Sequence, residues 1–169
     1  MKKTLIVALI CFLASFHSVN AQNRAGAFSL SGNLSYGTDI ESLGVALRAQ
    51  YGFTQYLRGM AEYKYYIDRH NWSAWGVNAD GHYVFSVSRA VQLYPLAGIS
   101  LSRWTYDTGR SKIHGIQNYK HTENRIGLNA GFGIEVGLAD NTYMQIEAKE
   151  ALIKDHSQFV ISLGFVYQF

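Results

Sequence analysis

The chain has 169 residues, a length that suits one domain, and its 15 Lys and Arg residues nearly balance 12 Asp and Glu residues. The net charge of +3 falls to about +1 without Lys2 and Lys3, which excludes the basic surface of a nucleic-acid-binding protein. The only cysteine is Cys11. It follows Ile10 inside an apolar run, which disfavours lipid attachment there and leaves the rest of the chain without disulfides or thiol ligands.

Residues 1–21 have the three parts of a secretory signal peptide. Two lysines form a positive start, residues 4–16 are mostly apolar, and Ala21 supplies the small residue that precedes a cleavage site. This segment is too short for a transmembrane helix. Cleavage after Ala21 leaves residues 22–169 as one exported domain.

Apolar and polar residues alternate with period two along the rest of the chain, which predicts β-strands. In the last segment one face carries Phe159, Ile161, Leu163, Phe165, Tyr167 and Phe169. Seven earlier segments repeat the pattern, at residues 28–36, 43–53, 57–67, 75–85, 91–101, 125–138 and 144–149. Most are about as long as a tilted strand that crosses a hydrocarbon core. The pattern predicts an all-β, eight-stranded antiparallel up-and-down transmembrane β-barrel.

The connections between these segments alternate in length. Tight turns are expected near residues 54–55, 87–88 and 139–141, and longer polar loops near 38–42, 68–73, 107–124 and 154–158. Short turns on one rim and long loops on the other are typical of outer-membrane barrels. An even number of strands then places both termini on the periplasmic side.

The two faces of the strands differ in a way that separates a membrane barrel from a soluble one. A lipocalin-like barrel has an apolar lumen and a polar exterior. Here the polar face is rich in Gly, Ser, Asn and Gln, which suits a crowded interior better than a soluble surface. Aromatic residues gather at strand ends, as interfacial girdles do. The periplasmic girdle is predicted to contain Tyr51, Phe53, Tyr83, Phe85, Phe165, Tyr167 and Phe169, and the outer girdle Tyr36, Tyr65, Trp72, Trp75 and Trp104.

The chain resembles the small outer-membrane β-barrel family related to OmpX and the OmpA transmembrane domain. The resemblance covers the whole mature chain and rests on the signal peptide, the alternating strands, the segment from Leu93 to Gly98 and the ending Gly164 to Phe169. It implies the outer membrane of a Gram-negative bacterium and contact with outer-membrane lipid and lipopolysaccharide. It also implies that Phe165, Tyr167 and Phe169 form a signal for the assembly machinery. Pro95 cannot donate a ladder hydrogen bond, so a bulge or bend is expected there.

The inward face is predicted to carry a network of paired charges. Its members are Arg48, Arg58, Glu62, Lys64, Asp80, Arg125, Glu135, Glu147 and Lys149. A turn centred on Gln55 would set Arg48 opposite Glu62. Eight strands leave an interior just wide enough for side chains, and buried charges must be paired to be tolerated. The leading interpretation is a filled lumen, and a narrow porin-like channel or a hydrophobic-ligand conduit is the alternative.

The loop at residues 107–124 is the candidate surface-contact element. Its basic and aromatic residues are Arg110, Lys112, His114, Tyr119, Lys120 and His121. Loops on a rigid scaffold often carry function, and this one suits lipopolysaccharide phosphates or a host surface. The alternative is a solvated extension of two strands. Arg103 lies on the apolar register near the outer rim, where it suits a lipid phosphate or snorkels to the interface.

Enzymatic chemistry and metal binding have little support in the sequence. A lipid A-modifying enzyme would need a Ser/His pair at the outer rim, and His156-Ser157 and His70 with Ser73 show no specific pattern. His114 and His121 have no partners at metal-ligand spacing. We therefore expect a monomer without enzymatic activity, cofactor or metal, whose role is structural or lies in surface contacts.

Overall fold

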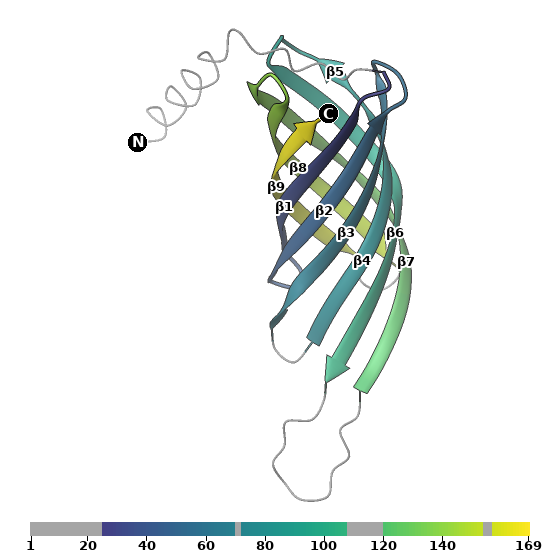
Figure 1. The fold of residues 1–169 in the computed structure, drawn as a ribbon. Coiled ribbons are helices and arrows are strands. Elements are labelled where there is room, and N and C mark those ends of the chain that lie inside the picture. Colours follow the sequence, from purple (N-terminus) through teal and green to yellow (C-terminus); the bar gives the residue numbers. More distant parts are fainter. Residues whose placement is uncertain (1–24, 70–71, 108–119, 154–156) are drawn as a thin grey trace, which may run out of the picture.

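The strands pair in chain order into one antiparallel sheet that closes on itself (Figure 1). The structure, a computed structural model, describes residues 25–69, 72–107, 120–153 and 157–169. Within these ranges no helix is long and apolar enough to cross a membrane. The strands are β1 (Phe28–Gly37), β2 (Ser42–Gly52), β3 (Leu57–Arg69), β4 (Trp72–Tyr83), β5 (Phe85–Ser86), β6 (Val91–Asp107), β7 (Lys120–Ala139), β8 (Thr142–Ile153) and β9 (Gln158–Gln168). Pairing of β1 with β9 closes the barrel.

β4 and β5 are two parts of one strand, so the barrel has the eight strands that the alternation predicted. β4 pairs with β6 as far as His82 opposite Leu96, and β5 resumes at Phe85 in the same register. Pro95 lies between these pairs and has no amide hydrogen to donate. Of the expected bulge or bend, the bulge is absent. The pairing with β4 and β5 is interrupted, but no residue is inserted, and the ladder to β7 continues through Pro95 and Phe132 without a shift.

The strands bury their polar face and expose their apolar face. β9, for example, alternates buried and exposed residues along its whole length. Leu47 is 71% exposed and Ile126 is 74% exposed, whereas the charged Arg48 and Glu62 are each 1% exposed. This is the reverse of a soluble barrel and confirms the prediction of a polar lumen and an apolar wall. Such a wall requires hydrocarbon around it.

The two rims of the barrel differ as the connection lengths predicted. The short-turn rim carries the turns at residues 53–56, 87–90 and 140–141, and the two ends of the barrel meet there where the Phe169 amide donates to the Phe28 carbonyl at 2.9 Å. The long-loop rim carries the other connections. There β6 and β7 extend beyond the neighbouring strands (Figure 1) and stay paired as far as Asp107 and Lys120.

Two of the expected long loops are shorter than predicted. The connection between β6 and β7 is 108–119, because Lys120 to Asn124 continue strand β7. The connection between β3 and β4 is only 70–71. Polar side chains at these positions suggested loops, but strands that rise out of the membrane also carry polar residues on both faces. The protruding part of β6 and β7, residues 103–107 and 120–125, is called the rim extension below.

Aromatic side chains form the girdle predicted at the short-turn rim. The rings of Tyr51 and Phe53 lie 5.3 Å apart, and those of Tyr167 and Phe169 lie 5.0 Å apart, all on the outer face. At the long-loop rim Trp75 is exposed as predicted, but Trp104 is not. The outward residues of β6 are the odd-numbered ones, so Trp104 belongs to the inward face. It is 5% exposed and packs in the lumen, so its assignment to the outer girdle is wrong.

Candidate functional site

Among the described residues, the lumen of the barrel holds eight buried charged side chains, which come from five strands. Four are cationic, Arg48, Arg58, Lys64 and Lys149, and four are anionic, Glu62, Asp80, Glu135 and Glu147. The inward half of the period-two alternation places them there, and each lies within ion-pair distance of an opposite charge. These eight residues are called the lumen network below.

Arg48 on β2 is the centre of the lumen network. Its Nε donates to Glu62, which lies directly opposite on β3, as the turn centred on Gln55 predicted. Its two terminal nitrogens donate to both carboxylate oxygens of Glu147, at 3.1 and 3.0 Å. Further bonds reach Gln145 at 3.2 Å and Ser162 at 3.0 Å. All five donors of the guanidinium are used, which ties β2 to β3, β8 and β9 across the lumen.

Two lysines complete the charge balance on the long-loop side of Arg48. Lys149 Nζ lies 3.0 Å from Asp80 Oδ2 and 3.4 Å from Glu62 Oε1, and Lys64 Nζ lies 3.1 Å from Glu62 Oε1. Asn78 donates to Glu62 at 2.6 Å and Asn129 donates to Asp80 at 2.7 Å. Each carboxylate therefore receives both ionic and amide donors, as a buried anion requires.

A second group of contacts lies on the short-turn side of Arg48. Arg58 donates to Glu135 at 2.8 Å and to His82 Nδ1 at 3.3 Å. The ring of Tyr94 lies 5.0 Å from the Arg58 guanidinium and stacks on His82 at 4.6 Å. Gln145 donates to Tyr94 Oη at 2.6 Å and to Glu135 at 3.0 Å. Tyr94 also donates to Glu147 at 3.2 Å, so the two groups form one connected network.

Glycines give the network the room it needs. A Cβ at Gly133 would lie 2.2 Å from the Tyr94 ring, and the two residues face each other across the β6–β7 ladder. Tyr94 cannot move away easily because its ring stacks on His82 and its hydroxyl bonds to Gln145 and Glu147. The glycines of the polar face thus allow large side chains to fill a narrow lumen.

The lumen contains small cavities on either side of this network. A cavity of about 40 Å³ on the long-loop side is lined by Lys64, Asn78 and Lys149 among others. Another of about 10 Å³ on the short-turn side is lined by Arg58 and Glu135 among others. Neither is lined by Arg48, Tyr94 or Glu147, which lie between them. The described part of the lumen is therefore interrupted at its centre by side chains.

One predicted member of the network lies apart from the others. Arg125 is at the long-loop rim, where its Nε donates to Glu123 at 3.1 Å and its guanidinium lies 5.4 Å from the Trp104 ring. Sequence reasoning also did not assign His82, Tyr94 and Gln145 to the network. All three share the inward register of the charged residues, so the alternation contained the signal, but their neutral side chains did not identify them.

The candidate surface-contact loop is described only at its ends. Arg110, Lys112, His114 and Tyr119 lie outside the described residues, as do His70 and His156 of the possible Ser/His pairs. Lys120 is the first residue of β7. His121 is in the rim extension and its Nε2 lies 2.9 Å from Glu123 Oε1, in an exposed contact. The described rim is therefore a mixed-charge surface with Arg103, His121, Glu123 and Arg125.

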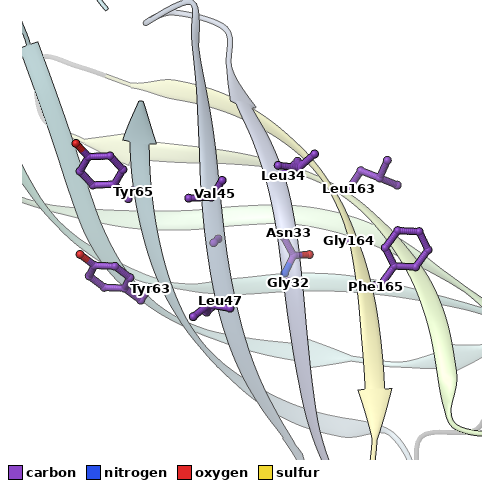
Figure 2. Close-up of a pocket in the computed structure, with 11 residues that line it drawn as sticks. Gly32, Asn33, Leu34, Val45, Leu47, Tyr63, Tyr65, Leu163, Gly164 and Phe165 are labelled. Atoms are coloured by element: carbon purple, nitrogen blue, oxygen red, sulfur yellow. The ribbon is translucent and has the colours of Figure 1, made fainter. Parts of the chain in front are cut away.

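The outer wall has an apolar groove that the sequence did not suggest (Figure 2). It has a volume of about 460 Å³ and runs over β9, β1, β2 and β3. Gly32 forms its floor, since a Cβ there would have no atom within 4 Å, and Leu34, Leu47 and Phe165 stand around it. Tyr63 and Tyr65 line its edge on β3. The groove lies in the lipid-facing wall, and none of the eight residues of the lumen network lines it.

The sequence profile of the outer membrane protein beta-barrel domain matches residues 6–169. The chain belongs to this family. This confirms the resemblance drawn from the strands and the terminal aromatic segment, and it places the protein among small outer-membrane β-barrels. No curated protein gives a significant match to the chain.

Solved structures confirm the fold. The N-terminal β-barrel domain of Pseudomonas aeruginosa OprF has a TM-score of 0.66 at 14% identity, covering 86% of this chain and 98% of that one. Ail, the attachment invasion locus protein of Yersinia pestis, has a TM-score of 0.61 at 15% identity, covering 86% and 99%. Neisserial surface protein A has a TM-score of 0.61 at 17% identity, covering 85% and 95%. At these identities the likeness shows an eight-stranded outer-membrane barrel and no more.

Proposed function

We propose that this protein is a sealed, non-enzymatic barrel that holds the rim extension and its basic loop at the cell surface, where they contact polyanionic saccharides. In this arrangement the short-turn rim and both termini face the periplasm after removal of residues 1–21. The barrel acts as a monomeric anchor, and the lumen network stabilises it rather than conducting ions.

The interrupted lumen supports the sealed barrel. Arg48 bonds to three other strands at the level where the two small cavities are separated. Opening a path there would break at least the Arg48–Glu147 pair and leave both charges in a narrow interior. A buried charge that loses its partner costs several kcal/mol, so the free energy needed to open a path through the lumen is of this order.

Recording in a planar bilayer tests this part of the proposal. The wild-type protein is expected to give no current steps, and the Arg48→Ser/Tyr94→Ala double variant is expected to give discrete ones. Steps from the wild-type protein would replace the sealed barrel with the alternative, a porin-like channel. Silence from the double variant, after its folding is confirmed by heat-modifiable gel mobility, would show that the network is not the seal.

The lengths of β6 and β7 support a role at the surface. They contain 17 and 20 residues, against 10 in β1 and 11 in β9. The additional residues at the long-loop rim keep β6 and β7 paired as far as Asp107 and Lys120. That connection and its ends carry Arg110, Lys112, His114, Lys120 and His121.

The charge and aromatic content of this loop suit a polyanion. Clustered Lys and Arg side chains attract sulfate and phosphate groups, and Tyr119 adds a flat surface for a sugar ring. Among the similar structures, Ail has been solved in complex with the heparin analogue sucrose octasulfate. That ligand is a property of Ail, but it gives a probe of suitable chemistry.

Titration of the protein in nanodiscs with sucrose octasulfate tests the contact. Binding is expected to weaken with salt and to fall about tenfold in the Arg110→Gln/Lys112→Gln variant, because two cations near the surface are lost. Arg89→Gln, at an exposed position of the short-turn rim, is the matched control and should bind as the wild type does. Equal affinities for all three proteins would overturn the loop as the contact surface.

The remaining alternatives predict different results. A conduit for hydrophobic ligands would need an open path between the groove over Gly32 and the lumen. A lipid A-modifying enzyme would change the mass of lipid A. An unchanged lipid A mass spectrum after expression is the result that our proposal expects.

A further inference from the structure

Arg103 on β6 is a cation on the lipid-facing wall of the barrel. The outward residues before it on β6 are apolar, the last of them Leu101, which lies opposite Ile126 on β7. One outward position further from the short-turn rim, Arg103 lies opposite Asn124. Both are exposed. The apolar band of the wall therefore ends between these two pairs, at the level where lipid headgroups begin.

The guanidinium of Arg103 is held in place by side chains of two neighbouring strands. Its Nε donates to Asn124 Oδ1 on β7 at 2.8 Å, and its Cζ lies 5.8 Å from the ring of Trp75, which pairs with Arg103 from β4. Within the described residues, no protein acceptor bonds to the two terminal nitrogens. The planar group is thus oriented with donor capacity left over.

Aromatic residues continue this arrangement along the wall. Trp75 is 39% exposed, and its ring lies 6.1 Å from that of Tyr63. Tyr65 lies opposite Trp75 in the β3–β4 ladder. Tyr63 and Tyr65 in turn form the edge of the apolar groove over Gly32 (Figure 2). A row of aromatic side chains therefore runs along the outer wall from Arg103 at the membrane interface to the apolar groove over Gly32.

We propose that Arg103, Trp75 and Asn124 form a binding site for a phosphate group of lipid A in the outer leaflet, with acyl chains lying along Tyr63 and the groove over Gly32. Arg103 provides two N–H donors to the phosphate oxygens. Trp75 orients the guanidinium, and Asn124 holds its Nε. The proposal does not depend on the surface loop or on the sealed lumen.

The geometry favours a phosphate of the surrounding membrane over an anion from solution. Arg103 points from the wall that faces lipid, so the headgroups of neighbouring lipids are the first anions it meets. The planar fork of Arg matches phosphate oxygens in pairs, whereas Lys would act as a point charge. A side chain that only snorkels to water would need neither the ring of Trp75 nor the amide of Asn124.

Native mass spectrometry of lipids retained by the protein tests the site. The protein is folded in phosphatidylcholine nanodiscs that contain either diphosphorylated lipid A or lipid A stripped of its phosphates. The wild type is expected to retain the phosphorylated form preferentially. Arg103→Gln should reduce that preference about fivefold, the effect of one cation near a charged interface, and Arg103→Lys should restore only part of it.

Two further variants separate binding from folding and from general charge. Arg89→Gln removes an exposed cation at the opposite rim and should retain lipid A as the wild type does. Gly32→Leu fills the groove and should reduce retention of both forms of lipid A without changing the preference between them. No preference for the phosphorylated form in the wild type, or an unchanged preference in Arg103→Gln, would overturn the proposal.

Discussion

The lumen and the rim extension both contain arginines and carboxylates, but they use them differently. In the lumen Arg48 has five bonds to protein partners and each of the other seven charges has an ionic partner. At the rim the described contacts are fewer and local. Arg125 bonds to Glu123 two residues away, and His121 lies beside the same carboxylate.

This difference shows where function is to be sought. Charges that are fully bonded within a narrow interior hold strands together and have little capacity for a ligand. Charges at the rim and on the wall keep donors that the described protein atoms do not use, as Arg103 does. The charged side chains that stabilise the barrel therefore lie in the lumen, and those that can contact lipid or solvent lie at the rim and on the outer wall.

Removing the centre of the lumen network should have the largest effect on stability. Arg48→Met leaves Glu62 and Glu147 buried with one cation fewer, and we expect a loss of about 3–5 kcal/mol in the free energy of unfolding. Urea unfolding of the protein in lipid vesicles measures it. The control Arg89→Met, at an exposed position, should change stability by less than about 0.5 kcal/mol. Similar values for both variants would remove the structural role assigned to the lumen.

A matched pair of glycines compares the crowded lumen with the open wall. Gly133→Ala places a methyl group where the Tyr94 ring lies, at 2.2 Å, and should cost about 1–3 kcal/mol. Gly32→Ala faces the groove, with no atom within 4 Å, and should be neutral within about 0.5 kcal/mol. The same unfolding measurement in vesicles applies to both. If Gly32→Ala proved as costly as Gly133→Ala, packing in the lumen would not explain the glycines there.

The barrel and its charge pairs could be predicted because both follow from local rules. A period of two fixes which face each residue joins, and a short turn fixes the register between neighbours. The pair of Arg48 and Glu62 needed only these two facts. Contacts across the lumen, such as Arg48 with Glu147 on β8, depend on the closure and stagger of the whole barrel and are not contained in any one strand.

The errors in prediction have the same origin. Trp104 was assigned to the girdle by residue type, although the register of β6 turns it inward. The bulge at Pro95 assumed that a missing donor must distort the strand, whereas a gap in one ladder was enough. The groove over Gly32 could not be anticipated, because it is formed by side chains of four strands that meet only in the closed barrel.

Removing the ion pair between Arg125 and Glu123 at the rim should have the smallest effect on stability. It also tests where the boundary between structural and accessible charges lies. Arg125→Gln shortens the side chain and removes the guanidinium that faces Glu123 and lies 5.4 Å from the Trp104 ring. The Glu123 side chain is 40% exposed, so water replaces much of the lost interaction, and we expect a loss of unfolding free energy that is small beside that of Arg48→Met. Glu123→Gln should have an effect of similar size. A loss near that of Arg48→Met would mean that the network extends to the rim, and the division between structural and accessible charges would then have to be placed further out, beyond Arg125.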